Sequence, residues 1–323
     1  MLAENLPMMT RWVDYAAGIA ASGRAENRAA ERPQPLPHER YLWDTGFHWG
    51  EWAEPGVYGG FGPGGDQSIV ATAYLSRSAR IVSDAARVVG DDTAAARYAE
   101  LAARCAEAWF VEHWDGSRLR IETQATYVRG LAFGLFPDDV VPVAVARLVE
   151  LVHAADDHLS TGFLSTPMLL PVLADHGHAD LAYRVLLSEG EPGWMVMLRR
   201  GATAIWESWD GIADDGTPKD SLDHYSKGAV ITFLHEYSAG LRNLAPGWSR
   251  FRVRPVLGGG LTHAAVAHDA SHGAVSSSWR IAGDRFALDV TVPEGSTAEI
   301  VLPDGTVHDV AAAGSHRFEC ALD

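Results

Sequence analysis

The sequence has little cysteine, and it lacks the fingerprints of metal and nucleotide sites. Only two cysteines occur in 323 residues, Cys105 and Cys320, and they lie far apart in the chain. No cysteine and histidine have the spacing of a zinc site, so we expect two free thiols and no metal. No dinucleotide-binding fingerprint occurs, and the glycine-rich run at 59–65 lacks the Gly-Lys-Ser/Thr of a phosphate loop. We therefore expect no cofactor, and we interpret the glycine-rich run as a flexible connector.

The sequence also lacks an excess of basic residues and any long hydrophobic run. Acidic residues outnumber basic ones by 42 to 26, which gives a net charge of −16. This charge argues against nucleic acid or an anionic membrane as a partner, and it is compatible with a neutral ligand such as a sugar. No apolar stretch approaches the ~20 residues of a membrane span. The N-terminus has no signal-peptide pattern, so we expect a cytoplasmic protein.

Helical periodicity dominates the first three quarters of the chain. The pattern predicts a first helix over 8–20, then a polar loop over 22–40. Asp92 and Ser221 are the expected N-caps of two of the later helices. The later helices are expected at 68–89, 92–111, 123–136, 139–154, 163–175, 178–188 and 222–242. Consecutive helical hairpins of this kind are typical of an α/α toroid.

The hydrophobic pattern changes to a period of two after about residue 245. Alternating segments separated by turns, among them 251–256 and 286–292, predict a small antiparallel β-sandwich. We therefore expect two domains, an α/α-barrel segment at 1–244 and a β-sandwich at 245–323.

The segment 201–210, Gly-Ala-Thr-Ala-Ile-Trp-Glu-Ser-Trp-Asp, is the best candidate for the chemistry. Glycoside hydrolysis needs two carboxyl groups, one to protonate the leaving oxygen and one to activate water or attack the sugar. Glu207 lies between Trp206 and Trp209, whose rings would hold a sugar and remove water from the carboxylate, strengthening it as a base. A surface loop with a structural ion pair would also explain this segment.

Two further segments carry candidate ligand-binding residues. The segment 221–228 is expected to present His224 at a helix start, where it either donates to a sugar hydroxyl or Glu207, or serves only as a cap. The segment 41–56 holds three tryptophans and three carboxylates, including Asp44 and Glu51, in a non-periodic stretch that favours a ligand-facing loop.

These segments resemble motifs of the α-L-rhamnosidases of glycoside hydrolase family 78, and the resemblance runs along most of the chain. The segment 201–210 is similar to the family's Gly-Ala-Thr-Thr-Ile-Trp-Glu-x-Trp signature. The segment 221–228, Ser-Leu-Asp-His-Tyr-Ser-Lys-Gly, is similar to its Ser-x-Asn-His-x-x-x-Gly. Residues 49–52, Trp-Gly-Glu-Trp, resemble its Gly-Asp-Trp loop, with Glu in place of Asp. The segment 161–170 resembles a helix start of the family, and the tail resembles its C-terminal β-sandwich.

The resemblance implies an (α/α)6 six-hairpin barrel and an inverting hydrolase that releases terminal α-L-rhamnose from a glycoside or oligosaccharide. Glu207 would be the general base. The two carboxyl groups of an inverting enzyme stand about 6.5–9.5 Å apart. The residues expected to contact the substrate are Glu51, Trp52, Trp206, Trp209, His224 and Asp44.

The sequence departs from the family pattern in one respect. The family's general acid lies in a motif similar to Asp-Cys-Pro-x-Arg-x-Glu-Arg, which does not occur here, and nothing favours Asp44, Glu51 or Glu54 as its replacement. The pattern gives about eight helices where a closed six-hairpin barrel needs twelve. We therefore expect a barrel without its first helices, whose open apolar flank would promote self-association.

Two alternatives stay open. The first is another α/α-toroid glycosidase or lyase with the same Glu207. The second is a carbohydrate-binding fragment without catalytic activity.

Overall fold

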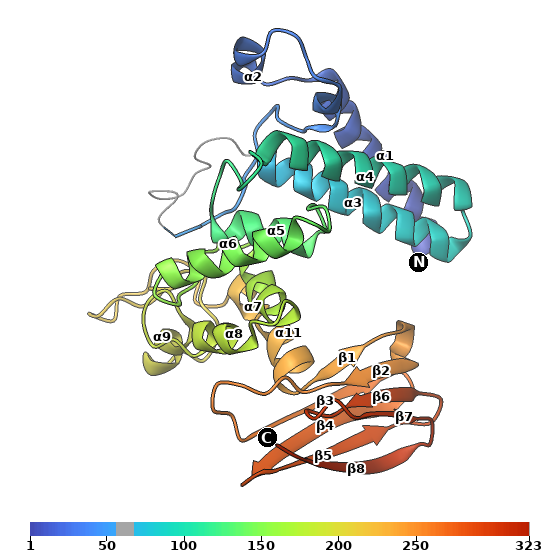
Figure 1. Cartoon of the computed structure of the whole chain (residues 1–323), viewed down its shortest axis with the longest axis vertical. Helices are drawn as coiled ribbons and strands as arrows, with labels where there is room; N and C mark the ends of the chain where they lie inside the picture. Colours follow the sequence, from blue (N-terminus) through green and yellow to red (C-terminus); the bar gives the residue numbers. More distant parts are fainter. Residues whose placement is uncertain (56–67, 323) are drawn as a thin grey trace. The chain divides into compact units, whose positions relative to one another are not determined.

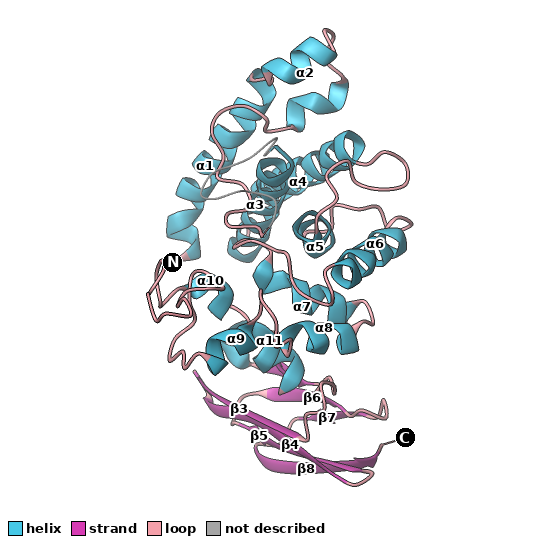
Figure 2. Cartoon of the chain, turned by 90° about the vertical axis from the view of Figure 1, so that its left-hand side faces the viewer, coloured by secondary structure: helices cyan, strands magenta, loops and turns pink. Residues whose placement is uncertain are grey.

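The computed structural model describes residues 1–55 and 68–322. Helices occupy the N-terminal part of the chain, and the strands follow towards the C-terminus (Figures 1 and 2). The chain divides into two compact units, Met1–Leu169 and Leu170–Asp323. The glycine-rich run at 59–65 lies outside the described residues.

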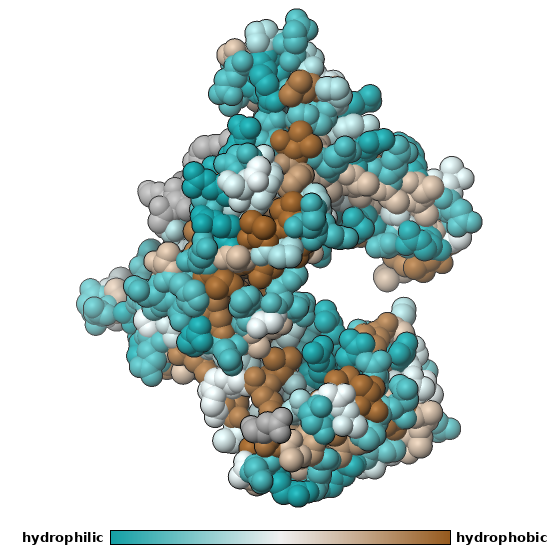
Figure 3. All heavy atoms as spheres, viewed as in Figure 1, coloured by the Kyte–Doolittle hydropathy of each residue, from teal (hydrophilic) through white to brown (hydrophobic). Residues whose placement is uncertain are grey.

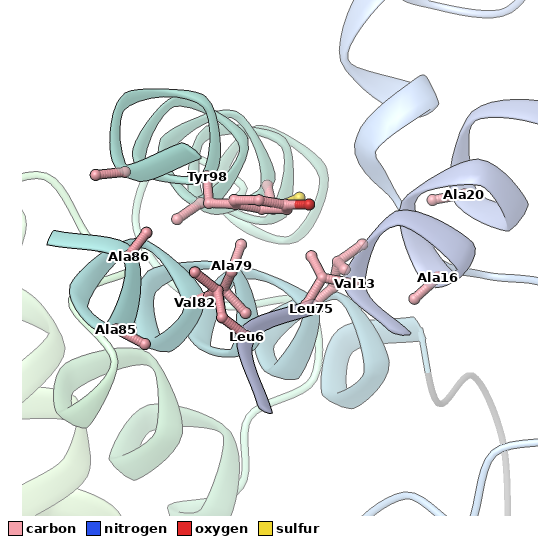
Figure 4. Packing of buried hydrophobic residues seen from close by; sticks show 13 residues of the cluster. Leu6, Val13, Ala16, Ala20, Leu75, Ala79, Val82, Ala85, Ala86 and Tyr98 are labelled. Carbon is pink, nitrogen blue, oxygen red and sulfur yellow. The ribbon is translucent and has the colours of Figure 1, made fainter. Parts of the chain in front are cut away.

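Three long helices build the core of the first unit. They are α1 (Leu2–Ser22), α3 (Ser68–Val89) and α4 (Asp92–His113). Their buried residues are mostly small, as Figure 4 shows for Ala16, Ala79 and Ala86, and small side chains allow helix axes to approach closely. Tyr98 of α4 reaches across this core and donates its hydroxyl to Asp14 at 2.9 Å. The predicted cap Asp92 is wrong by one residue, because the Asp91 side chain accepts from the Ala94 amide.

The segment predicted as a loop at 22–40 contains a short helix, α2 (Glu26–Glu31), and a 3₁₀ turn, η1 (Pro37–Tyr41). A six-residue helix is marginal by itself. Here Arg28 is buried and forms ion pairs with Asp44 and Glu112, so long-range contacts stabilise a helix that the local sequence does not indicate.

Two further helices complete the first unit. α5 (Gln124–Ala132) begins where the Thr123 side chain accepts from the Thr126 amide. It is followed by α6 (Val141–Ala154), which has Pro142 in its first turn, a favourable position for proline.

The helices of the second unit are shorter. The helices α7 (Thr166–Asp175) and α8 (Ala179–Leu186) were expected, whereas α9 (Trp194–Arg199) was not. The single helix predicted at 222–242 is wrong. The chain forms α10 (Tyr225–Gly228), α11 (Ile231–Phe233) and a π-helical turn, η2 (Leu234–Ser238). His224, not Ser221, caps α10, and Gly240 ends the helical run with a positive φ of 78°.

In the part of the chain that the structure describes, eight strands form two four-stranded sheets. One sheet has the order β1-β2-β6-β7 and the other β3-β4-β5-β8. All pairs are antiparallel except β2 with β6, which is parallel and was not anticipated. The strands are β1 (Leu241–Asn243), β2 (Arg250–Val253), β3 (His263–Ala270), β4 (Gly273–Ala282), β5 (Arg285–Val292), β6 (Thr297–Val301), β7 (Val307–Val310) and β8 (Gly314–Ala321).

Alternate residues of these strands fill a shared core, which explains the period of two in the sequence. Phe251, Trp279, Phe286 and Ile300 belong to this core, and the buried thiol of Cys320 lies beside them. The strand β1 lies before residue 245, where we expected the β-sandwich to begin. The boundary between the two domains stays a prediction.

Hydrogen bonds tie the helices of the second unit to its sheets. The indole of Trp279 donates to the Ser238 carbonyl at 2.7 Å, and the Tyr183 hydroxyl donates to the Val256 carbonyl at 2.7 Å. The Tyr183 ring also packs against Gly258, where an added Cβ would lie 2.3 Å from the ring. Close contacts of this kind attach α8 and η2 to the strands and to the segment that follows β2.

Apolar atoms also reach the surface, as the brown spheres among the teal ones in Figure 3 show. On α1, Met8, Trp12 and Tyr15 recur at helical spacing and are each more than half exposed. Within residues 1–55 and 68–322, no helix is long and apolar enough to cross a membrane.

Candidate active site

The segments that carry Glu207 and His224 lie side by side in the second unit. The Glu207 amide donates to the Ser221 carbonyl at 2.9 Å, and the His224 amide donates to the Ile205 carbonyl at 2.8 Å. The Ser221 amide donates back to Glu207 Oε2 at 3.2 Å. Main-chain hydrogen bonds thus bring together the two segments that carry Glu207, which is half-buried, and His224.

His224 has a defined tautomer in this arrangement. Its Nδ1 accepts from the Ser226 amide at 3.2 Å, so in the neutral ring the proton lies on Nε2. The ring stacks on Tyr225, with centroids 5.1 Å apart, and the Tyr225 side chain is 84% exposed. His224 is therefore a helix cap that also carries an N–H donor, and Tyr225 adds an exposed aromatic face that the sequence analysis missed.

The two tryptophans beside Glu207 pack inside the protein. Trp206 is 2% exposed and lies against Gly211, where an added Cβ would come within 2.9 Å of it. Trp209 is 8% exposed and meets Trp194 edge to face, with centroids 5.3 Å apart. The buried rings favour a packing role over the expected stacking on a sugar. The Trp209 Nε1–H is buried, and no acceptor for it lies among the described residues.

Lys227 is a further residue of this site, and the sequence analysis did not single it out. Its ammonium donates to the main-chain carbonyl of Glu207 and lies 4.7 Å from the centre of the Trp209 ring. Burial lowers the pKa of Lys227 to about 8, although the negative charges of Glu207, Asp210 and Asp220 oppose this effect. Its position one turn after His224 was the signal that could have indicated it.

Glu51, in the first unit, is the acceptor of a buried hydrogen-bond network. Both Glu51 and Arg129 are almost fully buried, at 2% and 1% exposed, and they form an ion pair. The Ser165 amide donates to Glu51 Oε1 at 2.8 Å, and the Ser165 hydroxyl donates to Oε2 at 2.9 Å. These contacts join segments distant in sequence, so Glu51 supports the structure of the first unit and is not exposed to a ligand.

Asp44 is also engaged within the first unit. It accepts from Arg28 Nε at 2.6 Å and from the Ala25 amide at 3.2 Å, and its side chain is 4% exposed. Both oxygens therefore stabilise α2, and the expected contact with a sugar has no support from this geometry.

Trp52 is half-buried, and its ring is part of an aromatic group that extends to the surface. Trp52 meets Trp49 with centroids 5.0 Å apart, and Trp49 meets Phe47 at 4.9 Å. Phe47 and Trp49 are 65% and 62% exposed. The loop expected to face a ligand thus exposes aromatic rings, although they are not the ring of Trp52.

Glu54 is the third carboxyl group of this loop, and it is 4% exposed. Burial, together with the charge of Glu51, raises its pKa to about 7, which a hydrogen bond with Thr123 and the charge of Arg129 only partly counteract. Glu54 is therefore a buried carboxyl group that binds a proton more readily than an exposed glutamate does. Across the described part of the chain, no three His, Cys, Asp or Glu side chains converge in a way that could hold a metal ion.

Two family models match nearly the whole chain. Residues 1–238 match the bacterial alpha-L-rhamnosidase 6 hairpin glycosidase domain, and residues 240–317 match the bacterial alpha-L-rhamnosidase C-terminal domain. The predicted fold class, a six-hairpin toroid segment followed by a small β-sandwich, is thereby confirmed.

Curated relatives and solved structures agree with these matches. An alpha-L-rhamnosidase of Streptomyces avermitilis is 37% identical over 276 residues, covering 78% of this chain and 26% of the relative. One from Alteromonas sp. (strain LOR) is 31% identical over 330 residues, covering 99% of this chain and 34% of the relative. The crystal structure of the Streptomyces avermitilis enzyme complexed with L-rhamnose is 32% identical, with a TM-score of 0.86, and covers 99% of this chain and 31% of that one.

A native rhamnosidase structure from Aspergillus terreus has a TM-score of 0.82 at 26% identity, covering 96% of this chain and 38% of that one. This chain spans about a third of the length of these relatives. With both domain models matched, and with relatives more than 30% identical over most of its length, the chain belongs to the bacterial α-L-rhamnosidases of glycoside hydrolase family 78.

Proposed function

We propose that the second unit carries the general base of an inverting α-L-rhamnosidase that releases terminal α-L-rhamnose from glycosides or oligosaccharides. The observation that carries the proposal is the main-chain pairing of the Glu207 segment with the His224 segment. This pairing holds a half-buried carboxylate and an imidazole donor in a fixed relation. The relatives are named alpha-L-rhamnosidases, and one of them was solved in complex with L-rhamnose. These relatives support rhamnose as the sugar that this site would bind.

In this proposal the Glu207 carboxylate takes a proton from water as the water attacks the anomeric carbon. The Ser221 amide holds Oε2, and no donor to Oε1 is found among the described residues, so Oε1 is the oxygen that would receive the proton. The Nε2–H of His224 would donate to a sugar hydroxyl, which loses its water when the ligand binds.

The inverting mechanism also needs a carboxylic acid that protonates the leaving oxygen. Asp44 and Glu51 are held in ion pairs with the buried Arg28 and Arg129, so neither is placed to reach a leaving oxygen. Glu54 holds a proton near neutral pH but is buried. None of the three replaces the family's general acid in this arrangement, so hydrolysis by this chain alone would need an acid other than these.

The test is hydrolysis of p-nitrophenyl α-L-rhamnoside by the chain, by Glu207→Gln and by Asp210→Asn as a matched control. Asp210 is an exposed acid three residues after Glu207, paired with Lys219 at 3.0 Å. We expect Glu207→Gln to lose at least ~100-fold in kcat and Asp210→Asn to stay near wild type.

The same assay distinguishes the alternatives. Hydrolysis of a glucoside or uronide in place of the rhamnoside would indicate another toroid glycosidase or lyase. Rhamnose binding without hydrolysis would indicate a carbohydrate-binding fragment, and neither binding nor hydrolysis would contradict the proposed function.

We also propose that the chain self-associates through the exposed apolar stripe of α1, formed by Met8, Trp12 and Tyr15. Light scattering after size exclusion is expected to show a mass that rises with concentration. The double substitution Met8→Ser/Tyr15→Ser should abolish this rise. Val307→Ser, which changes an exposed residue of β7, should not. A monomer whose mass does not change with concentration would contradict this proposal.

The cytoplasmic location of the protein stays a prediction.

A further inference from the structure

Lysine is scarce in this protein, and both lysines lie close to Glu207 in the sequence. The chain contains Lys219 and Lys227 against 24 arginines. Lys219 is about half exposed and forms an ordinary surface ion pair with Asp210. Lys227 is only 3% exposed, although lysine is among the residues that proteins bury least.

The contacts of Lys227 converge on the residue proposed as the base. Its ammonium donates to the Glu207 carbonyl, while its side chain lies over the face of Trp209. The Trp194 indole donates to the Lys227 carbonyl at 3.0 Å, which fixes the main chain from which the lysine side chain extends. The Glu207 amide donates to Ser221, and the Glu207 carbonyl accepts from Lys227. Hydrogen bonds thus hold the main chain of Glu207 on both sides.

Burying a charged amine costs free energy, and an apolar side chain of similar length would avoid this cost. The negative groups that act on Lys227 are Glu207, Asp210 and Asp220, and among them Glu207 has the largest effect. The direct contact between the two residues is the hydrogen bond from the Lys227 ammonium to the Glu207 main-chain carbonyl. Buried, perturbed charges of this kind are concentrated at functional sites.

We propose that Lys227 is a positioning residue for the general base. It fixes the main chain at Glu207 by donating to its carbonyl and by packing over Trp209, so that the carboxylate keeps the position in which it accepts a proton from water. This inference rests on the proposed function of Glu207. Lys227 acts through Glu207 and does not itself need to touch the substrate.

The first test does not depend on activity. Lysine labelled with ¹³C at Cε gives two signals in this chain, and Lys219→Met assigns them. A pH titration should show Lys227 losing its proton near pH 8. Lys219 should lose its proton only above the pH at which an ordinary lysine titrates, because its pKa is raised. In Glu207→Gln the Lys227 midpoint should fall by about half a pH unit, because the negative charge that favours the ammonium is gone.

The coupling would be refuted if the Lys227 midpoint were the same in Glu207→Gln as in the wild type. It would also be refuted if Lys227 titrated above about pH 10, as an exposed lysine does.

The second test is kinetic and compares Lys227→Met, Lys227→Arg and the surface control Lys219→Met. Lys227→Met should lower kcat for p-nitrophenyl α-L-rhamnoside at least ~10-fold with KM little changed. Lys227→Arg should recover part of the rate because it keeps a donor to the Glu207 carbonyl. A purely structural lysine would lower the melting temperature and leave kcat of the folded protein unchanged.

The outcomes separate this inference from the function on which it rests. If Glu207→Gln is inactive while Lys227→Met keeps the wild-type rate, only the role of Lys227 is wrong. If the wild type neither hydrolyses nor binds the rhamnoside, the proposed function fails, and the titration alone decides whether Lys227 and Glu207 are coupled.

Discussion

At the scale of single residues, buried carboxyl groups of this protein differ in the partners that surround them. Glu51 has a cationic partner in Arg129 and a hydroxyl donor in Ser165. Glu54 is equally buried, lies near the charge of Glu51, and has one oxygen without a hydrogen-bond donor among the described residues. The result is a group that binds a proton at a pH where a surface glutamate would not.

This difference predicts a pH-dependent stability. The pKa of Glu54 is raised from 4.5 to about 7 in the folded chain, so its contribution is fully present below pH 4.5 and lost as the pH rises to 7. The loss amounts to about 3 kcal/mol. Glu54→Gln stays neutral at every pH. We therefore expect it to exceed the wild type in unfolding free energy by up to this amount at about pH 8, and to match it at about pH 4.5.

Urea denaturation at the two pH values measures this effect. Glu294→Gln, an exposed glutamate of the sheet domain, is the control and should leave the pH dependence as in the wild type. A Glu54→Gln variant with the same pH dependence as the wild type would show that Glu54 does not titrate in this range.

The sequence predicted part of the site at this scale. Glu207 and His224 were found because their motifs are contiguous, and the main chain brings the two segments together. The role of Glu51 was missed because its partners, Arg129 and Ser165, lie 78 and 114 residues away. The packing of Trp206 and Trp209 was also missed, because an indole in a loop has the same sequence signal whether its ring is exposed or buried.

At the scale of secondary-structure elements, charge holds together what helix propensity does not. The short helix α2 and the turn η1 are attached to the end of α4 by ion pairs that converge on Glu112. Glu112 accepts from Arg32 at 2.6 Å and from His38 at 2.9 Å, and it also forms an ion pair with Arg28. Burial would raise the pKa of Glu112, but hydrogen bonds from Arg32 and His38 and the charge of Arg28 lower it to about 2.

This network predicts a loss of stability in acid. The pKa of Glu112 falls from 4.5 to about 2 on folding, so its contribution is present above pH 4.5 and lost as the pH falls to 2. Glu112→Gln should lower the unfolding free energy at neutral pH by about 3 kcal/mol, because the arginines lose their counter-charge. Denaturant unfolding from about pH 7 down to pH 3 would measure both effects.

Glu107→Gln is the matched control, since Glu107 lies on the same helix but is 61% exposed in its pair with Arg104. An exposed pair of this kind contributes about 0–1 kcal/mol. Equal effects of the two substitutions would contradict the role assigned to Glu112.

Long helices were predicted well, and short or interrupted ones were not. The bounds of α3 follow from an apolar face that repeats over 22 residues and ends before Gly90. The segment 222–242 has a similar apolar pattern, but its middle contains Gly228 and the β-branched run Val230, Ile231 and Thr232. The chain breaks there into short turns, and the close approach of Gly240 to Pro255 leaves no space for a side chain.

At the scale of the whole molecule, the change of hydrophobic period predicted the order of a helical part and a sandwich. The parallel pairing of β2 with β6 could not be predicted in this way, because the period of a strand does not specify its neighbour. The division into units at Leu169 and Leu170 was not predicted either, since it depends on contacts between segments that are remote in sequence.

The central claim is that Glu207 activates the water that attacks the sugar. Proton NMR of p-nitrophenyl α-L-rhamnoside during hydrolysis by the wild-type chain tests it most directly, because it shows which anomer of rhamnose is released first. We predict β-L-rhamnose as the first product, and no product formation with Glu207→Gln. Release of the α anomer first, or an unchanged rate in Glu207→Gln, would contradict the account.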